Sequence, residues 1–150
     1  MTEPHKPKQR FTLKEVNGTD DAIARVLRDM HRRVFDDSAP QIDPSEGYWW
    51  IAWKGDTAAG FAGLKLSVGT PGTAYLHRSG VLPYYRGNGL QQRFVKVREA
   101  KARELGMGRM VTDTTENIHS ANNLMSCGYR LYRPEGKWAY TESLYWQKPL

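Results

Sequence analysis

The sequence contains a single cysteine, Cys127, among its 150 residues, so no disulfide bond can form within the chain. No cysteines and histidines stand at the spacing of zinc ligands. The polar, basic segment 1–10 is not followed by an apolar stretch, and no run is long enough to span a bilayer. These absences predict a cytoplasmic protein that needs no metal and makes no membrane contact.

One segment of the sequence has few acidic residues, and this makes the charge balance uneven. The net charge of +6 arises from 22 Lys and Arg residues against 16 Asp and Glu residues. Residues 77–109 contain eight Lys or Arg and two Glu, so this segment alone carries the whole excess. Such a run is either a solvated helix face or a site for phosphates, on a cofactor or on a nucleic acid.

The sequence alternates strand and helix patterns over a length typical of one domain. Apolar residues spaced three and four apart, for example, predict the first helix. Residues 1–10 are expected to be a flexible arm, and 11–150 a single domain. The predicted strands cover 11–16, 49–53, 58–66, 74–82, 109–114, 129–132 and 138–146, and the predicted helices cover 23–34, 90–105 and 120–126.

This order of elements predicts an α/β fold built on one mixed sheet. Three successive strands, at 49–53, 58–66 and 74–82, are joined by short turns and are expected to pair antiparallel. The strand–helix–strand unit around the helix at 90–105 is expected to be parallel, with a right-handed crossover. We therefore expect a central, mostly antiparallel sheet of about six to seven strands, flanked by helices on both faces.

The most informative stretch is VLPYYRGNGLQQ, residues 81–92, in which a predicted strand passes through a glycine loop into the long helix. Gly87 and Gly89 permit positive φ angles and a close approach of the backbone to a ligand. The first N–H groups of a helix have no partner within it and lie at the positive end of its dipole. With Arg86 beside them they suit a pyrophosphate. A glycine turn without a ligand is the alternative.

The spacing of this loop differs from that of two common phosphate-binding loops. It is not G-x-x-x-x-G-K-[ST], and Gln92 stands where G-x-G-x-x-G requires a glycine. The stretch resembles instead the acetyl-CoA loop of the GNAT superfamily of N-acetyltransferases, where V-x-P precedes [R/Q]-x-x-G-x-[G/A]. The residues that match this pattern and the family's downstream spacing are Val81, Pro83, Arg86, Gly89, Asn117, Ser120 and Gly128-Tyr129, whereas Gln91 departs from it.

The resemblance implies that acetyl-CoA binds as co-substrate and that the fold is GNAT-like. The strand up to Val81 would offer backbone groups to the pantetheine arm, and Arg86 to Gln91 would hold the pyrophosphate. Asn117 would bind the pantetheine or, alternatively, cap a helix. The residues assigned to acetyl-CoA are Val81, Leu82, Pro83, Arg86, Gly87, Asn88, Gly89, Leu90, Gln91, Asn117 and Asn123.

Acyl transfer to an amine needs a base, an oxyanion donor and an acid for the leaving thiolate. In the resembling family the base stands four or six residues before the valine, which here gives His77 or Tyr75. Alternation along a strand would place both side chains on the same face as Val81. A histidine with a pKa near neutral suits a base, and a merely structural histidine is the alternative.

The acid is harder to assign from the resemblance. The family's usual tyrosine is replaced by Leu124, so the candidates are Tyr129 and Tyr132, with solvent as the alternative. Cys127 is better explained as a small apolar residue than as an acyl-carrying nucleophile. Because no activated nucleophile is evident, we expect the amine to attack directly in a ternary complex.

The sequence leaves the acceptor open. A primary amine on a small molecule or a protein is the first hypothesis, and nucleic acid or aminoacyl-tRNA is the second. A non-catalytic CoA-binding module is the third, since the usual tyrosine is missing. The aromatic residues form either core and a homodimer surface, or a wall for a substrate; they are Trp49, Trp50 and Trp53 on one predicted strand and Trp138, Tyr140, Tyr145 and Trp146 on another.

Overall fold

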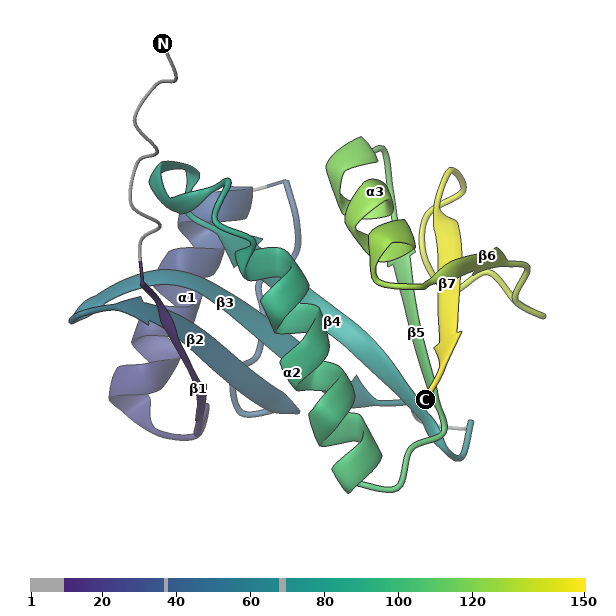
Figure 1. Ribbon diagram of the computed structural model, residues 1–150, viewed down its shortest axis with the longest axis horizontal. Coiled ribbons are helices and arrows are strands. Elements are labelled where there is room, and N and C mark those ends of the chain that lie inside the picture. Colours follow the sequence, from purple (N-terminus) through teal and green to yellow (C-terminus); the bar gives the residue numbers. More distant parts are fainter. Residues whose placement is uncertain (1–9, 37, 68–69) are drawn as a thin grey trace, which may run out of the picture.

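The computed structural model describes residues 10–36, 38–67 and 70–150. Most of the predicted arm lies outside this part, as do residue 37, after the predicted helix at 23–34, and residues 68–69, between the predicted strands at 58–66 and 74–82. The described chain forms one seven-stranded sheet in the order β1-β2-β3-β4-β5-β7-β6, flanked by helices (Figure 1). The elements are β1 (Thr12–Val16), α1 (Asp21–Phe35), β2 (Tyr48–Lys54), β3 (Thr57–Leu66), β4 (Thr73–Val81), the short 3₁₀ helix η1 (Pro83–Tyr85), α2 (Leu90–Glu104), β5 (Arg109–Thr114), α3 (Ile118–Ser126), β6 (Arg130–Tyr132) and β7 (Leu144–Pro149).

Helices cover both faces of the sheet, as predicted (Figure 1). Side-chain alternation along β2 divides the core, because Trp49 and Ile51 point to one face while Trp50 and Ala52 point to the other. On the first face α1 packs in a cluster made by Leu27, Met30, Ile42, Trp49, Ile51 and Phe61. On the second face α2 and α3 pack in a larger cluster that includes Trp50, Ala52, Phe94, Val95, Leu124 and Trp146.

Strand directions agree with the sequence prediction. The run β2-β3-β4 is antiparallel, and β4 pairs with β5 in parallel around α2. The parallel pairing is short, because only Thr73–Tyr75 meet residues 109–111. Both strands continue beyond that point, to Val81 and Thr114, without pairing with each other. The sheet therefore splits between its two halves.

A β-bulge interrupts the pairing of β3 with β4. Leu64 pairs with Leu76 and Ala62 pairs with Ser79, so Gly63 faces two residues, His77 and Arg78. One extra residue in a strand reverses the alternation beyond it. The predicted common face of Tyr75, His77 and Val81 is therefore wrong: Val81 joins the core under α2, whereas His77 makes an edge-to-face contact with Trp49 on the α1 side.

The predicted strand at 138–146 is also incorrect at its start. β7 begins only at Leu144, and Trp138 and Tyr140 lie in a loop. A turn ends the loop, with the Ser143 backbone N–H donating to the Tyr140 carbonyl at 3.1 Å and the Ser143 hydroxyl accepting from the Tyr140 N–H at 2.9 Å. High strand propensity of the aromatic residues misled the prediction. Across the described residues, no helix has the length and apolarity needed to cross a bilayer.

Candidate active site

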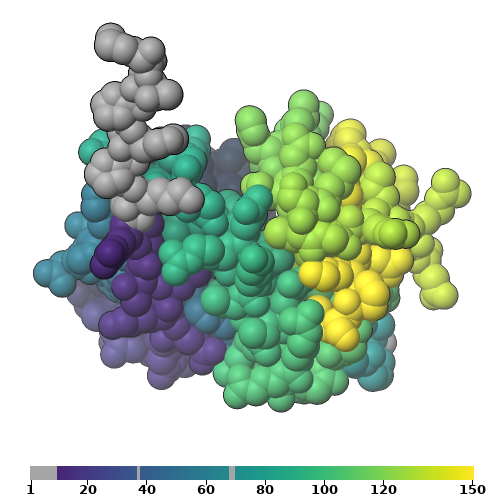
Figure 2. All heavy atoms as spheres, viewed as in Figure 1, coloured from purple at the N-terminus to yellow at the C-terminus, as the bar shows by residue number. Residues whose placement is uncertain are grey.

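The split between β4 and β5 opens beside the first turn of α2. Where the strands part, the Thr112 hydroxyl donates to the Leu76 carbonyl at 3.1 Å, replacing the lost backbone pairing. Beyond it the edges of β4 and β5 that face each other have no neighbouring strand. In the ribbon, the N-terminal end of α2 stands on one side of the split and helix α3 on the other (Figure 1). In the space-filling view a notch lies between the teal and green regions at the upper edge of the molecule (Figure 2). A ligand entering this notch meets free backbone groups and a helix N-terminus together.

The glycine loop leaves the N-terminus of α2 uncovered. Gly87 and Gly89 have φ angles of 82° and 73°, the left-handed region that glycine adopts without strain. Gly89 is the N-cap residue, and no side chain caps the helix. A Cβ atom at either glycine would meet no other atom within 4 Å, so the space above the loop is open. A helix N-terminus without a side-chain cap has free N–H groups, as an anion site requires.

Side chains of the loop fix its shape. The Asn88 amide donates to the Tyr85 carbonyl at 2.9 Å, so it serves the loop itself. Arg86 is exposed, and its Nε donates to the Val81 carbonyl at 3.4 Å, which leaves its terminal nitrogens available. Gln91 reaches back to β4, where its Oε1 accepts from the Ser79 hydroxyl at 3.1 Å. The residue that departs from the sequence pattern thus ties the helix start to the strand beyond the bulge.

On the α1 side of the split lies a cluster of rings around one carboxylate. The Tyr75 hydroxyl donates to Asp113 Oδ1 at 3.0 Å. The ring of Tyr75 lies 5.5 Å from that of Trp138 and 5.8 Å from that of His77, between centroids. Trp138 in turn lies 4.8 Å from Tyr145. The loop between β6 and β7 therefore closes over the point at which β4 and β5 part.

Burial sets the protonation states in this cluster. Desolvation, with smaller effects from the charges of Lys65 and Arg78, lowers the pKa of His77 to about 3. His77 is therefore neutral at physiological pH and a weak base. Burial and the neighbouring carboxylate raise the pKa of Tyr75. Burial raises the pKa of Asp113. The Tyr75 hydrogen bond and the charge of Arg78 both lower this pKa, but burial has the larger effect.

The part of the sequence that forms this site also identifies the family of the chain. Residues 18–129, from the start of α1 to the end of α3, match the model of the acetyltransferase (GNAT) family. This chain belongs to the GNAT acetyltransferases. No curated protein matches it in sequence. The predicted family is confirmed on a segment that contains the glycine loop, both flanking strands and the helix that follows.

Solved structures of other GNAT proteins share the fold at low sequence identity. An acetyltransferase of Bacillus subtilis in complex with CoA is 19% identical, with a TM-score of 0.72 over 94% of this chain and 99% of that chain. An IAA acetyltransferase from Bacillus cereus is 14% identical, with a TM-score of 0.73 over 94% and 100%. A ribosomal-protein-S18-alanine N-acetyltransferase from Escherichia coli is 12% identical, with a TM-score of 0.72 over 93% and 94%.

The far wall of the split comes from α3. Asn117 is the N-cap residue of this helix, and its Oδ1 accepts from the Ser120 N–H at 3.0 Å. The capping alternative is thus present, and the assignment of Asn117 and Asn123 to the pantetheine stays a prediction. Leu124, at the position where GNAT proteins usually have a tyrosine, is buried in the core with 7% exposure. It offers no proton to the site.

The two tyrosines proposed as acids are separated by the sheet. Tyr129 is 3% exposed on the α2 side, and its hydroxyl donates to Glu99 Oε2 at 2.9 Å. Tyr132 is half-buried and its ring meets that of Tyr145 edge-to-face at 6.4 Å between centroids, so it continues the aromatic cluster of the α1 side. The structure brings Tyr132, Tyr75 and His77 onto one face and leaves Tyr129 on the other.

Sequence reasoning missed two residues that shape the split between β4 and β5. Asp113 carries no motif, and only the parallel pairing brings it beside Tyr75. Arg98 is 2% exposed in α2, where its Nη1 donates to the carbonyls of Gly63 and His77 at 3.1 Å each. These carbonyls lie at the bulge, so Arg98 supports it. The sequence signal that could have identified Arg98 is the presence of an arginine on the apolar side of a predicted helix.

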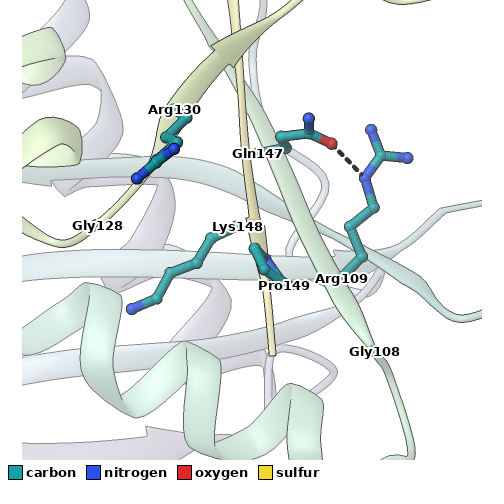
Figure 3. A pocket seen from close by; sticks show the side chains of 7 residues that line it. All are labelled: Gly108, Arg109, Gly128, Arg130, Gln147, Lys148 and Pro149. Atoms are coloured by element: carbon teal, nitrogen blue, oxygen red, sulfur yellow. Dashed lines mark hydrogen bonds between the residues drawn. The ribbon is translucent and has the colours of Figure 1, made fainter.

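A separate hollow of about 590 Å³ lies at the other end of β5, away from the split. Arg109, Arg130 and Lys148 line it together with neutral residues, and the Arg109 Nε donates to Gln147 Oε1 at 2.9 Å (Figure 3). Because of this position, the hollow is not part of the site at the split between β4 and β5. Within the described residues, no three His, Cys, Asp or Glu side chains are grouped as a metal site would need.

Proposed function

We propose that this chain transfers the acetyl group of acetyl-CoA to a primary amine, by direct attack within a ternary complex. The observation that supports it is one coincidence: the uncovered N-terminus of α2 lies where β4 and β5 separate. Family membership favours acetyl-CoA as the ligand of that place. When bound, acetyl-CoA supplies a thioester that is activated for attack and a thiolate that can leave.

The pyrophosphate is proposed to bind between Arg86 and Gln91. The N–H groups after Gly87 and Gly89 donate to it, and Arg86 adds a permanent charge. The Nε2 group of Gln91 is a further donor, because only Oε1 of this side chain is used by Ser79. Backbone groups of β4, up to Val81, Leu82 and Pro83, would bind the pantetheine arm along the free strand edge, with Asn117 and Asn123 opposite. The open space above both glycines fits this ligand.

The amine is proposed to approach from the α1 side, at Tyr75, His77 and Asp113. A primary ammonium must lose one proton before it attacks, and the second proton ends on the sulfur as the C–N bond forms and the C–S bond breaks. Asp113 is the stronger proton acceptor, because its pKa is raised while that of His77 falls to about 3. His77, Tyr75 and Tyr132 then orient the amine, and the thiolate takes its proton from the amine or from solvent.

Direct attack is favoured over an acyl-enzyme by the state of Cys127. Burial raises the pKa of this thiol, and the carboxylate of Glu99 raises it further. A thiol held in its protonated form is a poor nucleophile. Cys127 also lies after α3, where the Lys148 Nζ donates to its carbonyl at 2.8 Å. Mass spectrometry of the enzyme mixed with acetyl-CoA should therefore find no acetylated protein; a trapped acetyl-enzyme would overturn direct attack.

Thermal unfolding with and without acetyl-CoA tests the proposal. At about 100 times its dissociation constant, a ligand of the native state adds roughly 2.7 kcal/mol of stability. We expect a rise in the unfolding midpoint for the wild type and none for Arg86→Glu, which places a negative charge beside the pyrophosphate. Arg103→Glu, an exposed change elsewhere on α2, is the matched control and should respond like the wild type. No shift in the wild type at millimolar acetyl-CoA would overturn the cofactor assignment.

An acyltransferase that acts on nucleic acid is the second candidate function. The hollow lined by Arg109, Arg130 and Lys148 favours it (Figure 3). Lys148 pairs with Glu99, but Arg109 and Arg130 have no carboxylate within 4.0 Å among the described residues. Binding to phosphates would weaken steeply with salt. Binding of a mixed tRNA pool, measured between about 50 and 300 mM salt, tests this second function. Salt-sensitive binding that is lost in Arg130→Glu would support it. No binding of tRNA at any salt concentration would contradict it. Lack of turnover with every amine would instead favour a non-catalytic CoA-binding module.

A further inference from the structure

Two side chains of opposite charge on the α1 side of the split have no charged partner among the described residues. No Lys, Arg or His nitrogen lies within 4.0 Å of the Asp113 carboxylate, and no carboxylate lies that close to Arg78. Asp113 is half-buried and has the Tyr75 hydroxyl as its side-chain donor. Arg78 is half-buried with its guanidinium over the ring of Phe35, 5.4 Å from the centroid.

The two charges lie within electrostatic reach of each other although they form no ion pair. The charge of Arg78 lowers the pKa of both Asp113 and Tyr75. The bulge explains the arrangement, because it turns Arg78 to the same face as His77. Neighbouring cations are already engaged: Lys65 pairs with Glu46 at 3.1 Å, and Arg98 donates to backbone carbonyls. Arg78 is therefore the cation that a ligand on this face would meet.

Neutral rings occupy the space beside these charges. His77 lies next to Arg78 in the chain and contacts Tyr75, which in turn contacts Trp138. Trp138 is 44% exposed, so its ring is accessible from solvent. Aromatic faces attract an ammonium group by cation–π interaction. A half-buried carboxylate without a cation is costly, and an ammonium ligand would offset that cost.

We propose that the acceptor is an amino acid or a similarly small aminocarboxylate, whose ammonium binds Asp113 and whose carboxylate binds Arg78. This inference rests on the proposed acetyltransferase function. A diamine would place its second positive charge beside Arg78, where it is repelled. An amine with a neutral substituent would leave Arg78 unpaired. A zwitterion satisfies both charges at once and exposes its amino group where β4 and β5 part.

Acetylation rates for matched acceptors test this assignment. For each of the twenty amino acids, the free acid, the carboxamide and the decarboxylated amine are compared at saturating acetyl-CoA by release of free thiol. We expect at least one amino acid to exceed its carboxamide by about tenfold or more in kcat/KM, as the loss of a charge-assisted hydrogen bond predicts. Equal use of acid, carboxamide and amine, or no turnover of any amino acid, would overturn the inference.

Two variants assign the charges to residues. Asp113→Asn keeps an acceptor for the Tyr75 hydroxyl and should lower kcat/KM for the preferred amino acid by about tenfold or more. Arg78→Gln should remove the preference for acid over carboxamide. Glu142→Gln and Arg103→Gln, both exposed, are matched controls and should behave like the wild type. Wild-type kcat/KM in Asp113→Asn, or the wild-type preference for acid over carboxamide in Arg78→Gln, would contradict the assignment of that residue.

The acetyl-CoA shift in thermal unfolding separates this inference from the proposed function. Asp113 and Arg78 lie on the amine side, so both variants should keep the wild-type shift. If the wild type shows no shift, the proposed function fails. If the shift is present but amino acids are not preferred, the acceptor assignment alone is wrong. Midpoints of both variants without ligand show that they are folded.

Discussion

At the scale of single residues, the role of each basic side chain depends on its position in the fold and not on its position in the chain. The basic run at 77–109 reads as one patch in the sequence, but the structure distributes it. Arg98 is buried, Lys101 pairs with Glu15 at 3.2 Å, and Arg109 donates to Gln147. Arg78 points to the opposite face from the α2 core. The segment therefore serves at least three purposes, and Arg86 belongs to the glycine loop itself.

The buried histidine His77 predicts a loss of stability in mild acid. The unfolded chain binds a proton on this side chain near pH 6.5, whereas the folded chain does so only near pH 3. Lowering the pH through this window therefore favours the unfolded state. Between pH 7 and pH 5 we expect His77 to lower the free energy of unfolding by about 2 kcal/mol.

Urea unfolding of the wild type and of His77→Gln at both pH values measures this contribution. The variant should be the less sensitive of the two to pH. His119→Gln is the matched control, because His119 is exposed on α3. If His77→Gln and the wild type lost equal stability between pH 7 and pH 5, the imidazole would not be held neutral by burial.

At the scale of elements, the bulge in β4 is the feature that organises the site. It turns His77 and Arg78 to the α1 side and frees two carbonyls from the ladder. Arg98 of α2 donates to both, and burial lowers its pKa to about 10, so it stays charged at neutral pH. A helix on one face thus fixes the side chains presented on the other.

Arg98→Met is expected to destabilise the fold by about 1–3 kcal/mol, because it leaves the carbonyls of Gly63 and His77 without this donor while nearly preserving side-chain volume. Chemical denaturation of the variant and the wild type measures this difference in the free energy of unfolding. Arg103→Met, an exposed change on the same helix, should stay within about 0.5 kcal/mol of the wild type. Equal stability of Arg98→Met and Arg103→Met would show that the bulge does not need this donor.

At the scale of the molecule, a buried polar group joins the two halves of the split sheet. Glu99 of α2 accepts from Tyr129, which follows α3, and pairs with Lys148 of β7 at 3.0 Å. Glu99 is 4% exposed. Because β4 and β5 share only three residue pairs, these contacts and the core under α2 and α3 hold the halves at a fixed opening.

Tyr129→Phe separates this structural role from catalysis. Removing the hydroxyl leaves Glu99 one donor short, and we expect a stability loss of about 1–3 kcal/mol. The rate of acetyl transfer at saturating substrates should change by less than about tenfold, whereas loss of a general acid costs about a hundredfold or more. Tyr132→Phe is the stability control, because no hydrogen bond of its hydroxyl is present among the described residues. A hundredfold slower Tyr129→Phe would restore Tyr129 as the acid.

The sequence by itself determined most of the elements, the family and the position of the glycine loop. These follow from local signals: the spacing of apolar residues, Asn117 as a helix cap, and Gly87 and Gly89 at positive φ. Local signals are written into neighbouring residues, so they can be read without a fold.

The tertiary structure alone decided what stands on each side of the split. The bulge reverses the face of Val81 relative to His77, and one extra residue in a strand leaves no mark in composition. Asp113 meets Tyr75 across 38 residues of chain, and Arg98 meets Gly63 across 35. Such contacts depend on register and strand order, because proximity across a sheet is set by pairing and not by distance along the chain.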